Sequence, residues 1–350
     1  DIAEHALQHV DPLAAVKRYV KLDGNMLQVN ENVFNLNKVN KIYAIGAGKA
    51  TYPLAVALEE ILGDRITDGF IAIKKGQQNP FSDMLGTLSR IRVAESVHPV
   101  PDETSLAAGK EIWHIAEKAG PGDMVFCLMS GGVSAQSVYP VEGISFQDKV
   151  NINDLLVHSG ADVTEIMTVR RHLSRIKGGR LAPRMLPATV ISLTVSDEKT
   201  DSMEWNTDWT SPDSTTLADA VSVLKKYGLW EKVSEQIRDY LSTPTPEKET
   251  PKSFTNQPLH YCMVVKTREL WQAAAKKSKE FGLTPVLLTT LLSGESREVG
   301  RTIASIANEI ILSGNPIRPP CTLIATGETA VRIHTGAACR GGANQELAAG

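Results

Sequence analysis

The sequence predicts an α/β fold with a doubly wound, mostly parallel sheet, helices on both faces of that sheet, and two domains. Short runs rich in β-branched and apolar residues alternate with helix-length amphipathic stretches, which is the pattern of a parallel sheet covered by helices. The chain has 350 residues, of which 42% are hydrophobic and 22% are charged. This length exceeds the usual size of one domain and is sufficient for two cores.

Short apolar runs are the expected strands, and amphipathic helices fill most of the gaps between them. The runs span residues 41–45, 70–73, 91–94, 124–129, 189–195, 260–265, 285–289 and 321–325. The stretch 242–258 (STPTPEKETPKSFTNQP) holds four prolines and almost no apolar periodicity, so it predicts a linker or an exposed loop. We therefore expect an N-terminal α/β domain over 1–241 and the start of a second α/β domain over 259–350.

The two ends of the sequence predict that residues are missing from it. The chain opens with Asp1 and not with methionine, so we expect the true N-terminus to be missing. Residues 344–350 predict the opening of a helix that stops without a finished apolar face. The second domain is therefore expected to be incomplete at its C-terminus.

Composition excludes several classes of function. The formal net charge is -3, whereas proteins that bind nucleic acids or anionic membranes usually carry a basic excess. No apolar stretch approaches the roughly 20 residues that span a bilayer, and no secretory leader opens the chain. The cysteines lie far apart, which predicts buried thiols in a reducing compartment: Cys127, Cys262, Cys321 and Cys339. We expect a cytoplasmic monomer or homodimer that binds neither nucleic acid nor membrane.

The loop GAGKAT, residues 46–51, follows the first expected strand, and ligands of doubly wound sheets bind beyond the carboxyl ends of strands. Gly46 and Gly48 would let backbone N–H groups approach an anion, and Lys49 adds a positive charge. The loop is neither a P-loop nor a full dinucleotide fingerprint, because Thr51 replaces the third glycine. A tight turn with a solvated lysine is the alternative.

The segment ESVHPVPD, residues 95–102, follows the expected strand at 91–94, and its prolines stiffen it. His98 is a candidate acid, base or substrate donor because the pKa of histidine lies near neutrality. A histidine that only satisfies local backbone is the alternative. Asp102 is a candidate ligand residue and also suits the N-cap of the next helix.

The loop SGGVSA, residues 130–135, follows the very apolar run 124–129. Ser130, Gly131, Gly132 and Ser134 offer hydrogen-bond donors for a carboxylate or a phosphate. A hydrolase elbow would need glycine where Gln136 stands, so a serine nucleophile is disfavoured. A plain glycine turn is the alternative.

Positive charge is concentrated in VRRHLSRIKGGRL, residues 169–181, which the pattern predicts as a helix ending at its glycine pair. A continuous helix would place Arg171 and Arg175 on one face, and Arg170 and Lys177 on a neighbouring face. This density of cations predicts anions nearby. A solvated basic face is the alternative.

Asp197 follows the expected strand at 189–195, where a carboxylate commonly holds magnesium or accepts a hydroxyl proton. We expect the carboxylates that come after it to decorate a solvated loop: Glu198, Asp201, Glu204, Asp208 and Asp213. Two late segments, GETA and GGANQE, add Glu328, Asn344 and Glu346 as candidate ligand residues.

Taken in order, GAGKA, ESVHPVPD, SGGVSA, VRRHLSRIKGGRLA, SD, GETAV and GGANQEL resemble the motif series of the second (type II) glycerate kinase family, which has a MOFRL-type C-terminal domain. The resemblance covers nearly the whole chain. It implies a two-domain enzyme that transfers the γ-phosphoryl group of ATP to the 2-hydroxyl of D-glycerate, with Mg²⁺, giving 2-phosphoglycerate.

The resemblance also implies roles for particular residues. It makes Lys49 a catalytic phosphate contact and places the loop 130–134, Arg170 and Lys177 around the substrate and the phosphates. Asp197 is the residue of choice for the metal or the proton. Positioned cations and N–H donors suit this reaction, because its loose transition state is anionic.

Three residues depart from the family pattern. Val133 stands where the family has a third glycine, Met167 where it has asparagine, and Ala343 where it has the arginine of GGRNQEL. The family also continues beyond this point with a GTDGxDGPT segment, which this sequence lacks. Two alternatives therefore stay open: a kinase or oxidoreductase for another hydroxy acid, following the family's older label hydroxypyruvate reductase, or a ligand-binding homologue without turnover.

Overall fold

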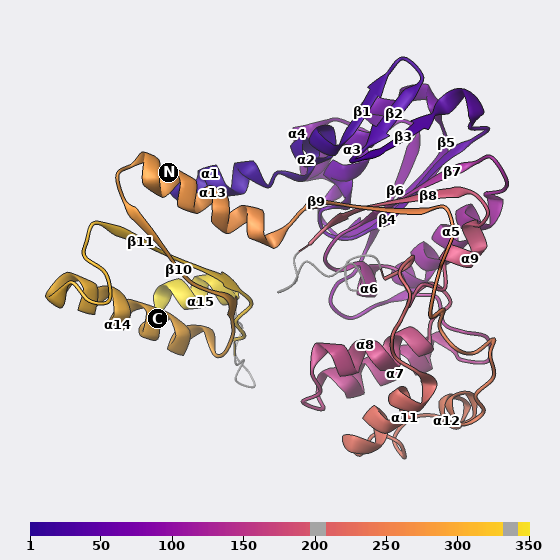
Figure 1. The fold of residues 1–350 in the computed structure, drawn as a ribbon. Coiled ribbons are helices and arrows are strands. Elements are labelled where there is room, and N and C mark those ends of the chain that lie inside the picture. The colour runs from indigo at the N-terminus through magenta and orange to yellow at the C-terminus, as the bar shows by residue number, and fades with distance from the viewer. Residues whose placement is uncertain (197–207, 332–341) are drawn as a thin grey trace. The chain divides into compact units, whose positions relative to one another are not determined.

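A computed structural model describes residues 1–196, 208–331 and 342–350 of the chain (Figure 1). The described residues divide into two compact units. The larger unit contains residues 12–196 and 208–264, and the smaller contains residues 1–11, 265–331 and 342–350. Each unit has its own sheet.

The larger unit is built on a six-stranded sheet with the order β6-β5-β4-β7-β8-β9. The strands from β4 to β8 pair in parallel. Their bounds are β4 (Ile42–Ala47), β5 (Ile66–Lys74), β6 (Ile91–Ser96), β7 (Met124–Met129), β8 (Thr189–Val195) and β9 (Leu259–Val265). Numbered along the chain, this order is 3-2-1-4-5-6, the order of doubly wound dinucleotide-binding folds. The predicted fold class is confirmed.

Helices cover both faces of this sheet, and every residue of β4 is buried. Tyr43 and Ile45 share a core with Ile112 and Ile115 of α5 (Glu103–Lys118). Side chains alternate between faces along a strand, so Gly46 points to the opposite face, where α3 (Thr51–Leu62) packs. The short helices of this unit are α2 (Pro12–Tyr19), α4 (Gln78–Leu85), α6 (Val133–Gln136), α9 (Ala182–Met185) and the 3₁₀ turns Leu36–Lys38 and Gly63–Arg65.

Four helices of the larger unit form a second core away from the sheet. They are α7 (Phe146–Val157), α8 (Val163–His172), α11 (Leu217–Lys226) and α12 (Glu235–Ser242). Figure 1 shows these helices grouped together, and buried side chains from all of them meet, including Ile152, Val169, Leu224 and Ile237. This core holds the C-terminal end of α8, and with it Arg170, in a fixed position.

An antiparallel sheet in the larger unit was not expected from the sequence. It consists of β1 (Val20–Asp23), β2 (Met26–Val29) and β3 (Asn32–Asn35). Gly24 and Asn30 make the connecting turns with φ angles of 57° and 51°, a region that glycine and asparagine adopt readily.

Residues 242–258, expected as a linker or exposed loop, pack along the larger unit. The Thr250 hydroxyl is buried and donates to Asp213 Oδ2 (3.0 Å), and Asp213 N donates to the Pro251 carbonyl oxygen (2.9 Å). Val190 N of β8 donates to the Pro258 carbonyl oxygen (2.8 Å), just before β9 joins the sheet. The division between the units falls at the end of β9, after Val264, because this strand is hydrogen-bonded into the six-stranded sheet.

Two carboxylates expected on a solvated loop are instead buried, so this expectation was wrong for them. Asp208 and Asp213 are 3% and 1% exposed. The buried guanidinium of Arg171 holds both, with Nε 2.8 Å from Asp208 Oδ1 and Nη1 3.2 Å from Asp213 Oδ1. They supply the anions for Arg171, one of the cations of residues 169–181.

The expected helix over residues 169–181 is also shorter than predicted. Helix α8 ends at His172, and the Ser174 hydroxyl then accepts hydrogen bonds from the N–H groups of Ile176 (3.3 Å) and Lys177 (3.2 Å). This local turn competes with helical hydrogen bonding. Arg171 and Arg175 therefore do not share a helical face.

The smaller unit contains a parallel pair of strands, β10 (Thr284–Leu292) and β11 (Cys321–Gly327). Its helices are α1 (Ile2–His9), α13 (Thr267–Glu280), α14 (Ser296–Ser313) and α15 (Ala343–Ala349). Helix α1 packs against α13, and α15 packs against α14 at Gly300, where a Cβ atom would overlap the Leu347 carbonyl oxygen. The helix expected at 344–350 is thus present as α15.

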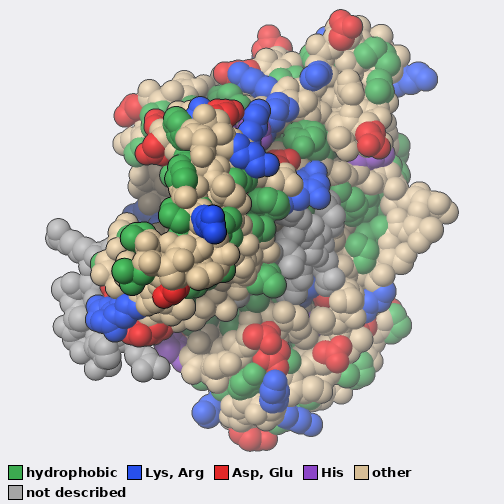
Figure 2. Space-filling model, turned by 60° about the vertical axis from the view of Figure 1, so that its left-hand side comes forward, with side chains coloured by type: hydrophobic (Ala, Val, Ile, Leu, Met, Phe, Trp, Pro, Cys, Tyr) green, Lys and Arg blue, Asp and Glu red, His purple; other side chains and the backbone are tan. Residues whose placement is uncertain are grey.

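The surface and the thiols fit the composition. Figure 2 shows lysine and arginine side chains interspersed with aspartate and glutamate side chains on one face. Cys127 and Cys262 are buried free thiols and Cys321 is partly exposed, whereas Cys339 lies outside the described residues. Within the described ranges, the helices are too short or too polar to cross a membrane.

Replacing Arg171 with alanine should lower the free energy of unfolding by about 3–5 kcal/mol, because two buried carboxylates lose their counter-ion. Urea unfolding followed by far-ultraviolet circular dichroism measures this change. Arg92→Ala is the control, since Arg92 pairs with Asp68 and Glu111 at the surface and its loss should cost under about 1 kcal/mol. Equal losses in the two variants would contradict the assignment.

Candidate active site

The order of the six-stranded sheet reverses between β4 and β7, and the loops that follow these two strands are joined by hydrogen bonds. Lys49 N donates to the Gly131 carbonyl oxygen (2.9 Å), and Ser130 N donates to the Ala47 carbonyl oxygen (3.3 Å). Ligands of doubly wound folds bind in the crevice at this reversal. The structure therefore brings the predicted glycine-lysine loop and the predicted serine-glycine loop together at the position where a ligand is expected.

The Ser130 hydroxyl holds the start of α3. Its Oγ accepts a hydrogen bond from Ala50 N (2.9 Å) and lies 3.2 Å from Thr51 Oγ1. Ala50 is the N-cap residue of α3 and offers no side-chain cap of its own. Ser130 thus orients the helix N-terminus behind Lys49, and Thr51 takes part in this contact at the position where a dinucleotide fingerprint would have glycine.

Gly48 is required by the close approach of the two loops. Its φ angle is 136°, and a Cβ atom there would lie 2.6 Å from the Ser130 carbonyl oxygen and would overlap the Ser130 hydroxyl. Gly46 is similarly tight, because a Cβ atom would lie 2.7 Å from the Leu128 carbonyl oxygen. Gly46 thus allows β4 to pack closely against β7, and Gly48 allows the loops after these two strands to approach each other.

Gly132 brings Lys49 and His98 together. A Cβ atom at Gly132 would lie 3.2 Å from His98 Cδ2 and 3.4 Å from Lys49 Cε, so both side chains border this glycine. Gly132 has a φ angle of 97° and is the N-cap residue of α6. His98 comes from the loop after β6 and Lys49 from the loop after β4, so three separate loops converge here.

The half-buried imidazole of His98 is surrounded by positive charge. Burial lowers the pKa of His98 below its usual value, and the charges of Lys49, Lys74 and Arg170 lower this pKa further. His98 is therefore neutral at pH 7. Lys74 is the last residue of β5 and directly follows the run 70–73 that was expected as the strand; sequence reasoning did not single it out as a site residue.

A second group of cations consists of two buried lysines, Lys149 and Lys177, and the partly exposed Arg170. Lys149 is 1% exposed, and its Nζ donates to the Arg170 carbonyl oxygen (2.7 Å) at the end of α8. Arg170 Nε donates to Asn153 Oδ1 (3.0 Å), and Lys177 Nζ donates to the Ser137 carbonyl oxygen (3.0 Å).

Burial sets the ionisation of these groups. It lowers the pKa of Lys149 well below its usual value, with Lys177 and Arg170 lowering it further. It also lowers the pKa of Lys177 to about 8, against the opposing attraction of Asp208. Like charges that are held together in a poorly solvated place favour an anionic ligand nearby. Sequence reasoning missed Lys149, because a lysine in an amphipathic stretch predicts a solvated side chain.

Two other candidate ligand residues, Asp102 and Ser134, make contacts within the protein. Asp102 is the N-cap of α5 and accepts hydrogen bonds from Thr104 N (2.9 Å) and Ser105 N (3.4 Å). Burial alone would raise the pKa of Asp102, but these hydrogen bonds hold it below its usual value. Ser134 Oγ lies 3.7 Å from the sulfur of Met167 on α8, so this hydroxyl faces one of the residues that depart from the family pattern.

The remaining candidates are Asp197 and three residues of the smaller unit. Asp197 is outside the described residues. Glu328, Asn344 and Glu346 belong to the smaller unit, where Glu328 and Asn344 are exposed. Glu346 Oε1 accepts hydrogen bonds from Arg297 Nε (2.8 Å) and Nη2 (2.7 Å), which fasten α15 to α14. Among the described residues, groups of three or more histidine, cysteine or acidic side chains that suit a metal ion are absent.

A doubly wound sheet whose order reverses at a glycine-lysine loop, with further cations close by, defines a protein that binds small phosphorylated or carboxylated molecules. A family model described as a domain of unknown function (DUF4147) matches residues 1–242. A glycerate 2-kinase of Pyrococcus horikoshii is 37% identical over 347 residues, which cover 98% of this chain and 76% of the relative. The chain belongs to the glycerate kinase family of phosphotransferases.

Other relatives agree in sequence and in structure. The D-glycerate 2-kinase of Thermotoga maritima is 35% identical over 323 residues, covering 91% of this chain and 73% of the relative. An Agrobacterium vitis protein provisionally named hydroxypyruvate reductase is 36% identical over 304 residues, covering 87% of this chain and 66% of the relative. The crystal structure of a Thermotoga maritima glycerate kinase superposes with a TM-score of 0.79 at 32% identity, covering 99% of this chain and 77% of that one.

Replacing Gly48 with alanine should destabilise the larger unit by about 1–3 kcal/mol or more, because the new methyl group meets Ser130 and the φ angle is strained. Thermal unfolding followed by circular dichroism measures the change. Gly143→Ala is the matched control, since Gly143 also has a positive φ angle (84°) but open space around it. A smaller loss for Gly48→Ala than for Gly143→Ala would refute the steric explanation.

Proposed function

We propose that this protein catalyses the ATP- and Mg²⁺-dependent phosphorylation of the 2-hydroxyl of D-glycerate to 2-phosphoglycerate. The observation that carries the proposal is the convergence of Lys49, Lys74 and Arg170 around His98 at the switch point of the sheet. Relatives named glycerate 2-kinase and D-glycerate 2-kinase support it. We place the reaction in the cytoplasm and assign the smaller unit to the start of a MOFRL-type domain.

The charge of the site suits phosphoryl transfer. The reaction passes through a loose transition state with charge spread over the phosphoryl oxygens, so catalysis rests on positioned cations and N–H donors. Lys49 and Arg170 would contact the phosphates or the glycerate carboxylate, and the loop 130–134 would donate backbone N–H groups. Lys177, which is charged below pH 8, adds positive potential from a region that is poorly solvated and therefore weakly screened.

The neutral imidazole of His98 gives it a separate role from its cationic neighbours. A neutral ring has one donor and one acceptor nitrogen, so it can bind a substrate hydroxyl without adding to the repulsion between lysines. The cations that lower its pKa keep it in this form. His98 would thus orient the hydroxy acid, and Asp197 would accept its proton or hold the metal.

The end of β8 suits a magnesium ion. The Ser196 hydroxyl is 5% exposed and, within the described ranges, is a buried oxygen without a hydrogen-bond partner. Mg²⁺ prefers such hard oxygen ligands and commonly takes one or two carboxylates together with substrate phosphates. Ser196 and Asp197 would hold the ion, which supplies charge neutralisation to the phosphate oxygens.

A different hydroxy acid is the second candidate substrate, and the contact between Ser134 and Met167 favours it. A thioether is a weak acceptor, so Met167 makes this wall of the site less polar than an asparagine would. Comparing ADP release across a series of hydroxy acids separates the two substrates. Brisk turnover of another acid without turnover of D-glycerate would replace the first assignment.

Replacing Lys49 with alanine should lower kcat by roughly 10²–10³-fold, the usual effect of removing one group that stabilises developing charge. A coupled ADP-release assay on the full-length protein with D-glycerate, ATP and Mg²⁺ measures it. Lys118→Ala is the control, because Lys118 pairs with Asp68 at the surface. Full activity of Lys49→Ala would remove the proposed phosphate contact, and nucleotide binding without turnover by the wild type would indicate a homologue that has lost catalysis.

The activity should also fall at alkaline pH. Because the pKa of Lys177 is about 8, this side chain is charged below pH 8 and becomes neutral as the pH rises through it. ATP and D-glycerate stay fully anionic in that range, so their KM values should rise above pH 8. A pH series of kcat/KM tests this, and Lys177→Met should have higher KM values without the alkaline limb. An unchanged limb in this variant would assign it to another group.

A further inference from the structure

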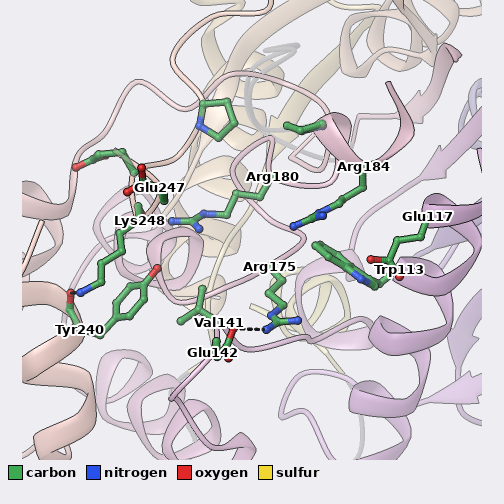
Figure 3. A pocket seen from close by; sticks show the side chains of 13 residues that line it. Trp113, Glu117, Val141, Glu142, Arg175, Arg180, Arg184, Tyr240, Glu247 and Lys248 are labelled. Carbon is green, nitrogen blue, oxygen red and sulfur yellow. Dashed lines mark hydrogen bonds and ion pairs between the residues drawn. The ribbon is translucent and has the colours of Figure 1, made fainter. Parts of the chain in front are cut away.

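A second candidate site lies in a pocket of about 630 Å³ in the larger unit (Figure 3). Residues from α5, from the segment 175–184 and from the segment 240–251 line it. Arg175, Arg180, Arg184 and Lys248 bring positive charge to this lining. The lining includes none of the residues that converge at the switch point, so the pocket is separate from the candidate active site.

Trp113 orients two of the guanidinium groups. The Arg184 guanidinium carbon lies 4.6 Å from the centroid of the Trp113 ring, and that of Arg175 lies 5.8 Å from it. Figure 3 shows both arginines beside this indole. Cation–π contacts of this kind hold a guanidinium in place while its N–H donors stay available. The indole therefore serves as a platform for cations.

Arg180 adds a desolvated donor. Its Nη2 donates to the Lys248 carbonyl oxygen, which fixes the guanidinium toward the segment 240–251. Its Nε is buried and, among the described residues, lacks a hydrogen-bond partner. A buried donor without a partner costs free energy that a bound acceptor would recover.

Four glutamates also line the pocket, namely Glu117, Glu142, Glu247 and Glu249, so its lining holds as many carboxylates as cations. Glu142 lies 3.3 Å from Arg175 and is 94% exposed. Glu249 is held by the N–H of Leu217 (2.9 Å) and by Lys252 (3.2 Å).

The three remaining cations have other partners or none. In the described part of the chain, carboxylates at ion-pair distance are absent for Arg180, Arg184 and Lys248. The Lys248 ammonium instead donates to the carbonyl oxygens of Tyr240 (3.2 Å) and Thr243 (2.9 Å). Arg180 and Arg184 thus have the most donor capacity left for a ligand.

We propose that this pocket binds a small multivalent oxyanion, one that carries two or more phosphate or carboxylate groups. Guanidinium groups match both kinds of oxyanion with paired N–H donors. Arg180 would bind one group inside the pocket, and Arg184 on its Trp113 platform would bind another. The proposed pocket ligand does not depend on the proposed function, whereas the test below uses the phosphate contact proposed for Lys49.

Isothermal titration calorimetry of the full-length Lys49→Ala protein with pyrophosphate, and separately with citrate, tests this site. The Lys49→Ala background weakens phosphate binding at the candidate active site, so the remaining binding reports on the pocket. Adding Arg184→Glu should weaken that binding about ten-fold or more, since charge-assisted hydrogen bonds are lost and repulsion replaces them. Binding of pyrophosphate alone identifies phosphate as the recognised group, and binding of citrate alone identifies carboxylate.

Arg18→Glu is the matched control, because it makes the same charge change at an exposed arginine of α2 outside the pocket. It should leave binding unchanged. Arg184→Gln repeats the test without reversing the charge, and circular dichroism establishes that each variant is folded. The proposal fails if neither anion binds the Lys49→Ala protein, or if Arg184→Glu and Arg18→Glu change the affinity equally.

Discussion

The contact between the loops after β4 and β7 is the constraint on which the candidate active site depends. Ser130 offers its carbonyl group and its hydroxyl to the space beside Gly48, and a side chain at position 48 would fill that space. The same hydroxyl accepts the N–H of Ala50 at the start of α3. Ser130 and Gly48 thus connect the loop after β7, the loop after β4 and the start of α3. Lys49 lies between Gly48 and Ala50, so these contacts fix the position of its backbone.

Electrostatics adds a second constraint behind these loops. Lys149 and Lys177 are buried beside Arg170, and burying like charges together is unfavourable unless anions or hydrogen bonds offset the cost. Asp208 offsets part of it, since the Asp208 carboxylate accepts hydrogen bonds from Arg171 Nε (2.8 Å) and from Gly178 N (3.2 Å). Arg170 of this group also lowers the pKa of His98, together with Lys49 and Lys74.

Much of the fold could be predicted from local pattern, because the strands of a covered parallel sheet are continuous apolar runs such as Met124–Met129. Strands β1 to β3 were missed because four-residue strands carry too little pattern to distinguish from loops. The end of α8 at His172 was missed because the following turn is made by the Ser174 hydroxyl and not by glycine or proline. The burial of Lys149, Asp208 and Asp213 was not predicted. A charged side chain is buried only where tertiary partners compensate its charge, and local sequence does not show these partners.

The buried thiol of Cys127 can report local opening of the six-stranded sheet. It lies at the centre of β7 with its Sγ 3.9 Å from the sulfur of Met185, and burial raises its pKa far above the usual value. A thiol in this state does not react with alkylating reagents, because the nucleophile is the thiolate. Its rate of labelling would therefore follow the opening of the sheet beneath the candidate active site. The core thus contains a native cysteine whose alkylation rate reports local unfolding without any engineered substitution.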